Sequence, residues 1–203
     1  FKLPKNKSII TKNSPMTFYP TYVLDYLSEG MILRLEFNGA LVKVIESNND
    51  YIVLECINSG IVGNNKGVDI LNYEIQLDDF TEKDLAALEI GKRMGIEEVF
   101  ISFCKSSKAV LKAKSIIPKA RIVSKIESKL SIHNLNDICK VSDALLIDRG
   151  DLTREINIMD IPFAQRGIVK NALENNLPCY VATNVLESLI EGKLPTRAEL
   201  NDI

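Results

Sequence analysis

The chain has 203 residues, of which 46% are hydrophobic and 26% are charged. Its 25 lysines and arginines are balanced by 27 acidic residues, which excludes a generally basic surface for nucleic acid and a polybasic membrane patch. No apolar run approaches the length of about 18–20 residues that spans a bilayer. With a single histidine, the chain is not expected to hold a histidine-rich zinc site.

Residues 1–76 have the pattern of a small antiparallel β domain. Strands are predicted at residues 31–37, 40–46 and 51–57, where apolar and polar residues partly alternate. Asn38-Gly39, between the first two strands, is a hairpin signal. Short strands joined by tight turns predict a small β-barrel or sandwich.

Residues 77–203 instead predict alternating helices and strands. The first helix begins in the capping-box-like segment Thr81-Glu82-Lys83-Asp84 and ends at Gly95. Beyond it, strands are predicted at residues 99–103, 120–126, 144–147 and 178–183, and helices at residues 105–117, 133–141, 162–175 and from 185 onward. Buried strands separated by helices predict a parallel sheet, open or closed into a barrel. No Gly-x-Gly-x-x-Gly motif follows a strand, which removes the main support for a dinucleotide-binding domain.

Two features of the chain concern its cellular compartment and the extent of its native sequence. The four cysteines lie far apart with no Cys-x-x-Cys pair, so we expect reduced thiols in a cytoplasmic protein. The chain opens at Phe1 without an initiator methionine or a signal-peptide pattern, and it closes inside a predicted helix at Ile203. We therefore expect the native sequence to continue beyond both ends.

Polar residues collect where the predicted parallel strands end, which is where α/β folds carry their active residues. The four strand ends carry Ser102-Phe103, Lys125-Ile126-Glu127, Asp148-Arg149-Gly150-Asp151 and Thr183-Asn184. Lys125 and Glu127 are two residues apart on an extended segment, so their side chains are expected to point to the same side.

The carboxylates among these residues favour a divalent cation. Glu127 and Asp151 come from adjacent strand ends, and such a pair suits Mg²⁺ or Mn²⁺. A cation there would help to hold Lys125 close to a substrate and would polarise a carbonyl or enolate oxygen. The segment Arg149-Gly150-Asp151-Leu152, before a helical turn, would offer backbone N–H groups to an anion. Each residue alone is commonly a solvated surface charge, but their coincidence on successive strand ends favours a functional site.

Three segments of the chain resemble the pyruvate kinase family. Residues 122–127, Ile-Val-Ser-Lys-Ile-Glu, are similar to its I-I-S-K-I-E strand, which carries a lysine and a metal ligand. Residues 142–152 are similar to its S-D-G-I-M-V-A-R-G-D-L segment. Residues 181–188, followed by Pro-Thr-Arg-Ala-Glu at residues 195–199, resemble A-T-Q-M-L-E-S-M and P-T-R-A-E. The likeness covers essentially the whole chain in the family's order.

The resemblance implies an α/β fold in which residues 77–203 form part of a (β/α)8 TIM-type barrel and residues 1–76 form an inserted all-β lid domain. It implies a glycolytic kinase that moves the phosphoryl group of phosphoenolpyruvate to ADP, giving pyruvate and ATP. The family implies a cytoplasmic homotetramer with Mg²⁺ or Mn²⁺ as cofactor and with no nucleic-acid or membrane partner. K⁺ is also expected from the family, but its ligands would lie outside this chain.

The resemblance also assigns roles to individual residues. Lys125 would neutralise the transferring phosphoryl group and support the enolate, and Glu127 and Asp151 would bind the divalent metal. The backbone amides of Gly150 and Asp151 would hold the substrate carboxylate together with Thr183.

The remaining roles that the resemblance implies are lining the substrate pocket and protonating the enolate. The Thr183 hydroxyl would take part in protonating the enolate, and Ser102 and Phe103 would line the pocket.

The chain departs from the family pattern in the lid and at the carboxylate site. Phe37-Asn38-Gly39 stands where the family commonly has D-D-G, which removes two lid carboxylates. Asp148 stands where the family has a small residue and adds negative charge beside the site for the substrate carboxylate. Thr153-Arg154 replaces a glycine and an apolar residue.

Two alternatives to the kinase follow from these departures. The first is a catalytically degenerate relative that serves as a binding or regulatory module and still holds a metal and a small carboxylate. The second is a metal-dependent lyase of the phosphoenolpyruvate/pyruvate barrel type, which would keep Glu127 and Asp151 but not need a phosphoryl-binding arginine.

Overall fold

The computed structural model describes residues 8–11, 16–36, 39–48, 51–73, 75, 77–183 and 185–201. The chain divides into two compact units, Phe1–Asp78 and Asp79–Ile203. Within the part of the chain described, no helix is long and apolar enough to cross a membrane. The four cysteines are free thiols.

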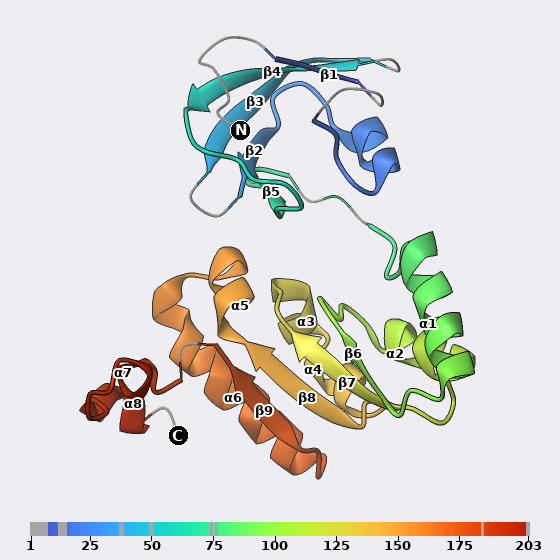
Figure 1. Cartoon of the computed structure of the whole chain (residues 1–203), viewed down its shortest axis with the longest axis vertical. Coiled ribbons are helices and arrows are strands. Elements are labelled where there is room, and N and C mark those ends of the chain that lie inside the picture. Colours follow the sequence, from blue (N-terminus) through green and yellow to red (C-terminus); the bar gives the residue numbers. More distant parts are fainter. Residues whose placement is uncertain are drawn as a thin grey trace. The chain divides into compact units, whose positions relative to one another are not determined.

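The first unit is built on a five-stranded antiparallel sheet with the strand order β1-β4-β3-β2-β5 (Figure 1). Its strands are β1 (Ser8–Thr11), β2 (Ile32–Leu35), β3 (Ala40–Ser47), β4 (Tyr51–Asn58) and β5 (Val68–Ile70), and a short 3₁₀ helix, η1, spans Thr21–Tyr26. Alternate residues of β2 and β3 are buried with Leu54 of β4, as expected for strands with one face on a core. The strands predicted at residues 31–37, 40–46 and 51–57 are confirmed as β2, β3 and β4, although β2 ends at Leu35, and Phe37 and Asn38 lie outside the described residues. Strands β1 and β5 and helix η1 were not predicted.

The second unit holds a four-stranded parallel sheet in the sequential order β6-β7-β8-β9. Its strands are β6 (Glu98–Ile101), β7 (Arg121–Ile126), β8 (Ala144–Asp148) and β9 (Cys179–Ala182). Its helices are α1 (Glu82–Met94), α2 (Ser107–Ile116), α3 (Lys129–His133), α4 (Leu135–Cys139), α5 (Arg149–Glu155), the 3₁₀ helix η2 (Ile158–Asp160), α6 (Ile161–Glu174), α7 (Glu187–Ile190) and α8 (Arg197–Asn201). The predicted parallel sheet is confirmed.

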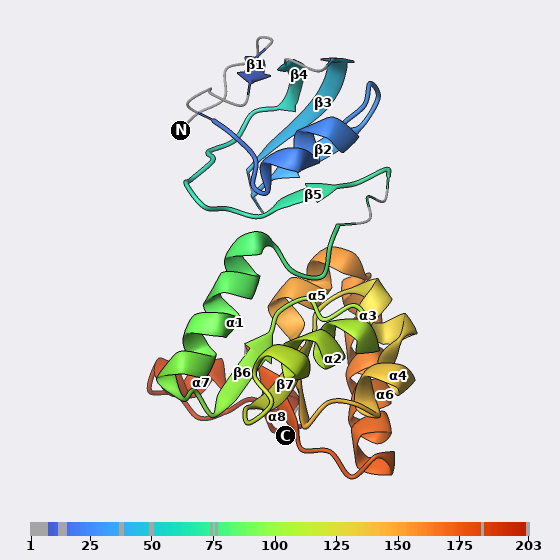
Figure 2. The same cartoon turned by 90° about the vertical axis from the view of Figure 1, so that its right-hand side faces the viewer.

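The two faces of this parallel sheet differ. Helices α2, α4 and α6 pack on one face, which we call the helix-covered face (Figure 1 and Figure 2). Since side chains alternate along a strand, the same strands supply the opposite face. The helix-covered face receives Val99, Ile101, Ile122, Ile126, Leu145 and Ile147. The opposite face receives Phe100, Val123, Lys125, Leu146, Asp148 and Tyr180.

The helix predicted over residues 133–141 corresponds to α4, which is shorter by two residues at each end, and α3 was not predicted. The structure has two short helices, α3 and α4, which meet at Asn134, whose φ of −96° and ψ of 13° are not helical. The Asn134 side-chain amide donates a hydrogen bond of 2.8 Å to the carbonyl of Lys105. This contact with a distant segment lies at the junction between the two helices, and local periodicity does not show it.

The last two helices are joined by one carboxylate, that of Glu199. It accepts hydrogen bonds from the backbone N–H of Ser188 at 2.8 Å and of Thr196 at 2.6 Å. These backbone donors, with the Ser188 hydroxyl, lower the pKa of Glu199 to about 2. The Pro-Thr-Arg-Ala-Glu segment therefore has a structural function, which is to fix α7 to the start of α8.

Candidate active site

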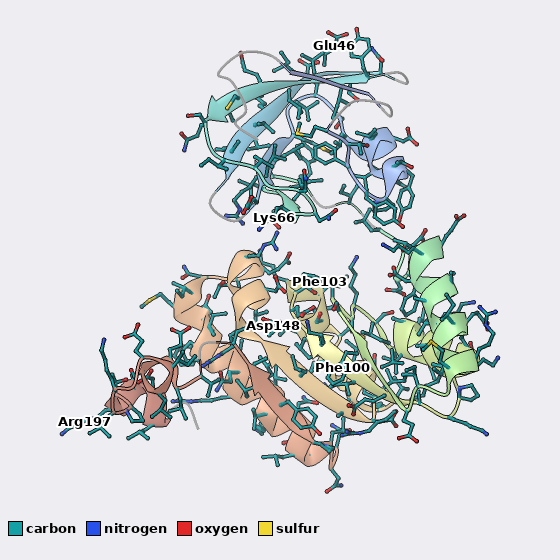
Figure 3. All side chains as sticks on the ribbon, viewed as in Figure 1. Glu46, Lys66, Phe100, Phe103, Asp148 and Arg197 are labelled. Atoms are coloured by element: carbon teal, nitrogen blue, oxygen red, sulfur yellow. The ribbon has the colours of Figure 1, made fainter. Side chains whose placement is uncertain are left out.

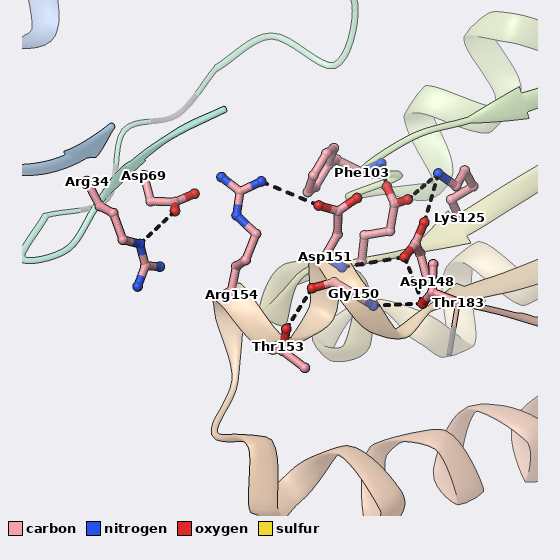
Figure 4. Close-up of polar contacts among 11 residues, drawn as sticks. Arg34, Asp69, Phe103, Lys125, Asp148, Gly150, Asp151, Thr153, Arg154 and Thr183 are labelled. Carbon is pink, nitrogen blue, oxygen red and sulfur yellow. Dashed lines mark hydrogen bonds and ion pairs between the residues drawn. The ribbon is translucent and has the colours of Figure 1, made fainter. Parts of the chain in front are cut away.

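Strand β7 delivers a lysine and a buried carboxylate to the opposite face of the sheet. Lys125 lies near the end of the strand, and Glu127 follows directly after it. The Lys125 Nζ atom forms an ion pair with Glu127 Oε1 and lies 3.4 Å from Asp148 Oδ2 (Figure 4). The prediction that Lys125 and Glu127 point to the same side is therefore confirmed.

Glu127 is held from the other side by the turn that follows β6. Its side chain is fully buried, and Oε2 accepts a hydrogen bond of 2.6 Å from the backbone N–H of Phe103. Phe103 has a φ of +48°, a left-handed conformation that is uncommon for residues other than glycine and often marks functional sites. The turn thus aims a main-chain donor at the carboxylate. Ser102, its neighbour, is exposed, and no hydrogen bond between described residues ties it to this cluster.

Strand β8 and helix α5 supply two further carboxylates. Asp148 is the N-cap residue of α5, and its Oδ1 lies 3.4 Å from the backbone nitrogen of Asp151. Asp148 and Phe103 lie at the same end of the sheet (Figure 3). One oxygen from each of Glu127, Asp148 and Asp151 lies within 4.8 Å of the other two. The Asp151 carboxylate also pairs with Arg154, at 3.4 Å.

Thr183 closes the cluster from the end of β9. Its hydroxyl oxygen accepts a hydrogen bond of 3.0 Å from the Gly150 N–H. The hydroxyl has two acceptors within reach, the Ala182 carbonyl at 2.7 Å and Asp148 Oδ1 at 3.5 Å. Since a hydroxyl donates one hydrogen, the shorter contact is favoured. Arg149 donates to the Thr183 carbonyl at 2.6 Å and 3.1 Å, which fixes the backbone of Thr183 at a φ of +65°.

Burial and pairing shift the pKa values of the central pair. Burial raises the pKa of the Glu127 carboxyl by more than Lys125 and the Phe103 amide lower it. Burial alone would lower the pKa of Lys125, but the carboxylates of Glu127 and Asp148 outweigh it and leave this pKa above its ordinary value. The lysine therefore stays protonated at neutral pH.

The donor set fits a hard divalent cation. It consists of carboxylate oxygens, which Mg²⁺ and Mn²⁺ prefer. Among the described side chains, Glu127 Oε1 is a buried atom that accepts no hydrogen bond, and Lys125 is its ion-pair partner. Such an atom is suited to binding a cation. Glu127 and Asp151 were predicted as the ligands, and the structure brings a third carboxylate, Asp148, to the same place.

Sequence reasoning missed three contacts of this site. The Phe103 N–H leaves no signal in the sequence because every residue except proline carries this group. The clamp of Arg149 on the Thr183 carbonyl joins two strand ends, and no local pattern predicts it. Asp148 did have a signal, since an aspartate three residues before Asp151 at a strand-to-helix junction is a typical N-cap.

Comparisons with known proteins find relatives over nearly the whole chain. A family model described as "Pyruvate kinase, barrel domain" matches residues 5–203. A pyruvate kinase of Chlamydia pneumoniae is 32% identical over 93% of this chain and 40% of its own length. A pyruvate kinase of Lactobacillus delbrueckii subsp. bulgaricus is 33% identical over 98% of this chain and 34% of its own length.

A third relative has a higher identity over a shorter stretch. It is a pyruvate kinase of Clostridium acetobutylicum, 35% identical over 81% of this chain and 36% of its own length. The chain thus spans about two fifths or less of the length of these curated relatives. A family model that matches nearly every residue, together with relatives that align over most of the chain, decides the family. The chain belongs to the pyruvate kinase family.

Proposed function

We propose that the protein carrying this chain transfers the phosphoryl group of phosphoenolpyruvate to ADP, giving pyruvate and ATP. The observation that carries the proposal is the convergence of Lys125 on the buried Glu127, with Asp151 within 4.8 Å. Phosphoryl transfer needs positioning and neutralisation of charge more than it needs covalent chemistry, and these residues supply both.

In this proposal Lys125 is the catalytic cation. Its ammonium group is held by Glu127 and by Asp148 at 3.4 Å, so it is fixed before the substrate arrives. A preorganised charge stabilises the transferring phosphoryl group and the enolate without reorganisation during the reaction. The raised pKa keeps the ammonium charged at neutral pH.

Glu127 and Asp151 are the proposed ligands of Mg²⁺ or Mn²⁺. A divalent cation bound there would neutralise charge on the phosphoryl and enolate oxygens. The Phe103 N–H orients Glu127, and the ion pair of Asp151 with Arg154 orients the second carboxylate. Ser102 and Phe103 would line the pocket beside them.

Thr183 is proposed to bind the substrate carboxylate and to take part in protonating the enolate. Its oxygen is fixed by the Gly150 N–H at 3.0 Å, and its hydroxyl carries a proton next to the carboxylate cluster. The Gly150 and Asp151 backbone amides with the Thr183 hydroxyl would hold the substrate carboxylate, and the same hydroxyl would take part in protonating the enolate.

The barrel, the lid domain and the oligomeric state are also part of the proposal. The sequential order of β6 to β9 supports a part of a (β/α)8 barrel, which requires eight such strands. The separate antiparallel unit supports a lid domain. A cytoplasmic homotetramer that uses K⁺ from ligands outside this chain completes the proposed enzyme.

The test is formation of pyruvate from phosphoenolpyruvate and ADP, with Mg²⁺ and K⁺ present, by the protein that carries this chain. We expect Lys125→Met to lower kcat by about 100-fold or more, because a preorganised charge is lost from the transition state. The matched control is Lys170→Met, since Lys170 is an exposed lysine of α6. An unmodified protein that forms no pyruvate would contradict the proposal.

One observation favours a second candidate, the non-catalytic binding module. Asp148 places a carboxylate among the groups that would receive the substrate carboxylate. Binding of Mn²⁺ without any turnover would support this candidate. Release of pyruvate from a hydroxy-keto acid without nucleotide would instead support the lyase.

A further inference from the structure

Asp148 contacts groups of the site that the proposed reaction needs for binding its substrate. Its Oδ1 lies 3.4 Å from the Asp151 backbone nitrogen and 3.5 Å from the Thr183 hydroxyl (Figure 4). Its Oδ2 lies 3.4 Å from Lys125 Nζ. A carboxylate of this chain therefore contacts three of the groups to which the proposed function assigns a bound substrate.

The charge that Asp148 adds lies where its effect on ligands is strong. Its side chain is 16% exposed, and that of Lys125 is 19% exposed, so water screens their interaction less than it screens a surface pair. Asp148 shares Lys125 with Glu127, while the third carboxylate, Asp151, pairs with Arg154. Each added carboxylate strengthens the attraction for a divalent cation and weakens the attraction for an anion.

We propose that Asp148 is a specificity-determining residue of this site. Its carboxylate lies against the Asp151 amide and beside the Thr183 hydroxyl, where a carboxylate-bearing substrate would bind, and it offers a third oxygen to the divalent cation. Compared with a small or neutral residue at this position, Asp148 makes the site bind the cation more tightly and a small carboxylate less tightly. The inference rests on the proposed function, because it concerns the same metal and substrate groups.

The experiment measures two affinities of the protein that carries this chain by calorimetry. The first is for Mn²⁺, and the second is for oxalate, an enolate mimic, in the presence of saturating Mn²⁺. We expect Asp148→Asn to bind Mn²⁺ about 10-fold more weakly and oxalate about 10-fold more tightly, since one charge leaves the cluster. Asparagine keeps an oxygen acceptor for the Asp151 amide, so the N-cap of α5 is preserved.

Two further variants separate charge at the site from other effects. Asp148→Ala should change both affinities in the same directions, with a larger gain for oxalate because the acceptor itself is removed. Asp137→Asn is the matched control, since this aspartate of α4 is 66% exposed and pairs with Lys140. It should leave both affinities unchanged.

The outcomes distinguish this inference from the proposed function. If Glu127→Gln weakens Mn²⁺ binding while Asp148→Asn leaves both affinities unchanged, the role given to Asp148 is wrong and the metal site stands. A change in only one of the two affinities also contradicts it. If Glu127→Gln and Asp151→Asn bind Mn²⁺ as the unmodified chain does, or if that chain binds none, the proposed metal site itself is wrong.

Discussion

The two faces of the parallel sheet are made from the same four strands, yet they carry different kinds of residue. On the helix-covered face, Ile122 and Ile126 of β7 are fully buried among α2, α4 and α6. On the opposite face, the same strand presents Lys125. The two outer strands of the sheet, β6 and β9, present Phe100 and Tyr180 there, which are 47% and 44% exposed. One face is packed against helices, whereas the other leaves Phe100 and Tyr180 about half exposed.

This difference shows how one short strand can contribute both to the core and to the candidate site. Because side chains alternate along β7, every second residue faces the helices and the others face the opposite side. A polar residue on the opposite face therefore does not replace a residue of the core. The helix-covered face holds the strand in place, and the opposite face then holds Lys125 at a fixed position. Substitutions on the two faces should therefore differ in what they change.

The largest effect is expected for Ile122→Ala on the helix-covered face. The side chain is fully buried, and its loss leaves a cavity beneath α2, so we expect the free energy of unfolding to fall by about 2–5 kcal/mol. Urea denaturation measures the change. The matched variant on the opposite face is Phe100→Ala, which should cost less although it removes a larger side chain. Equal costs would contradict the distinction between the faces.

The next effect concerns Lys125→Met, which removes the charge from the opposite face. Glu127 and Asp148 then repel each other without a cation, and we expect a loss of about 1–3 kcal/mol at neutral pH, less than for a fully buried pair.

This loss should depend on pH with a definite sign. Without the ammonium, the pKa of Glu127 rises further above 4.5, so protonation on acidification relieves the repulsion. The deficit of Lys125→Met is therefore full above that raised pKa and shrinks as the pH falls through it. The pKa of Lys125 itself lies above 10.5, so the unmodified chain keeps the charge throughout this range. Urea denaturation at about pH 5 and about pH 8 measures the trend, and a deficit that grows on acidification would contradict it.

A smaller effect is expected for Ser124→Ala, which tests the polar group on the helix-covered face. Ser124 is buried, and its hydroxyl lies 2.7 Å from that of Ser142, which also donates to the Ile138 carbonyl at 2.8 Å. Ser142 keeps this second partner in the variant, so the cost should be about 0.5–1.5 kcal/mol. Thermal unfolding measures it, with the exposed Ser115→Ala on α2 as control. A cost like that of Ile122→Ala would mean that the serine pair is more than a local hydrogen bond.

The smallest effect is expected for Phe100→Thr on the opposite face. The ring is about half exposed, and threonine fits a strand well, so the free energy of unfolding should change by about 0.5 kcal/mol or less. Urea denaturation again measures it. A loss of several times this size would show that another segment buries the opposite face.

Much of the fold follows from the period of the apolar residues. The predictions for residues 40–46 and 144–147 correspond closely to β3 and β8, because β3 alternates buried and more exposed residues and β8 is an apolar run that is mostly buried. Helix α3 and the start of α4 at Leu135 did not follow. The hydrogen bond from Asn134 to the carbonyl of Lys105, at the junction of the two helices, is a contact between distant segments. β5 was too short to give a pattern.

The candidate site follows from the sequence only in its side chains. Because parallel strands end at one edge, the sequence placed Lys125, Glu127 and Asp151 together, and the distances agree. The main-chain donors and the clamp of Arg149 did not follow, because they depend on how the turns between strands are shaped. The roles of these residues stay predictions for the experiments above.

The backbone N–H that Phe103 donates to Glu127 has a consequence for how this site is studied. Replacing Phe103 with alanine leaves that donor in place, so a conventional alanine scan would find nothing at this position beyond the loss of a ring. Glycine would keep the donor and would adopt the φ of +48° without strain. Proline, which lacks the hydrogen and cannot take this φ, would remove the contact. A contribution made by the main chain is thus invisible to a survey of side chains, and the tolerance of a position to substitution does not measure its importance.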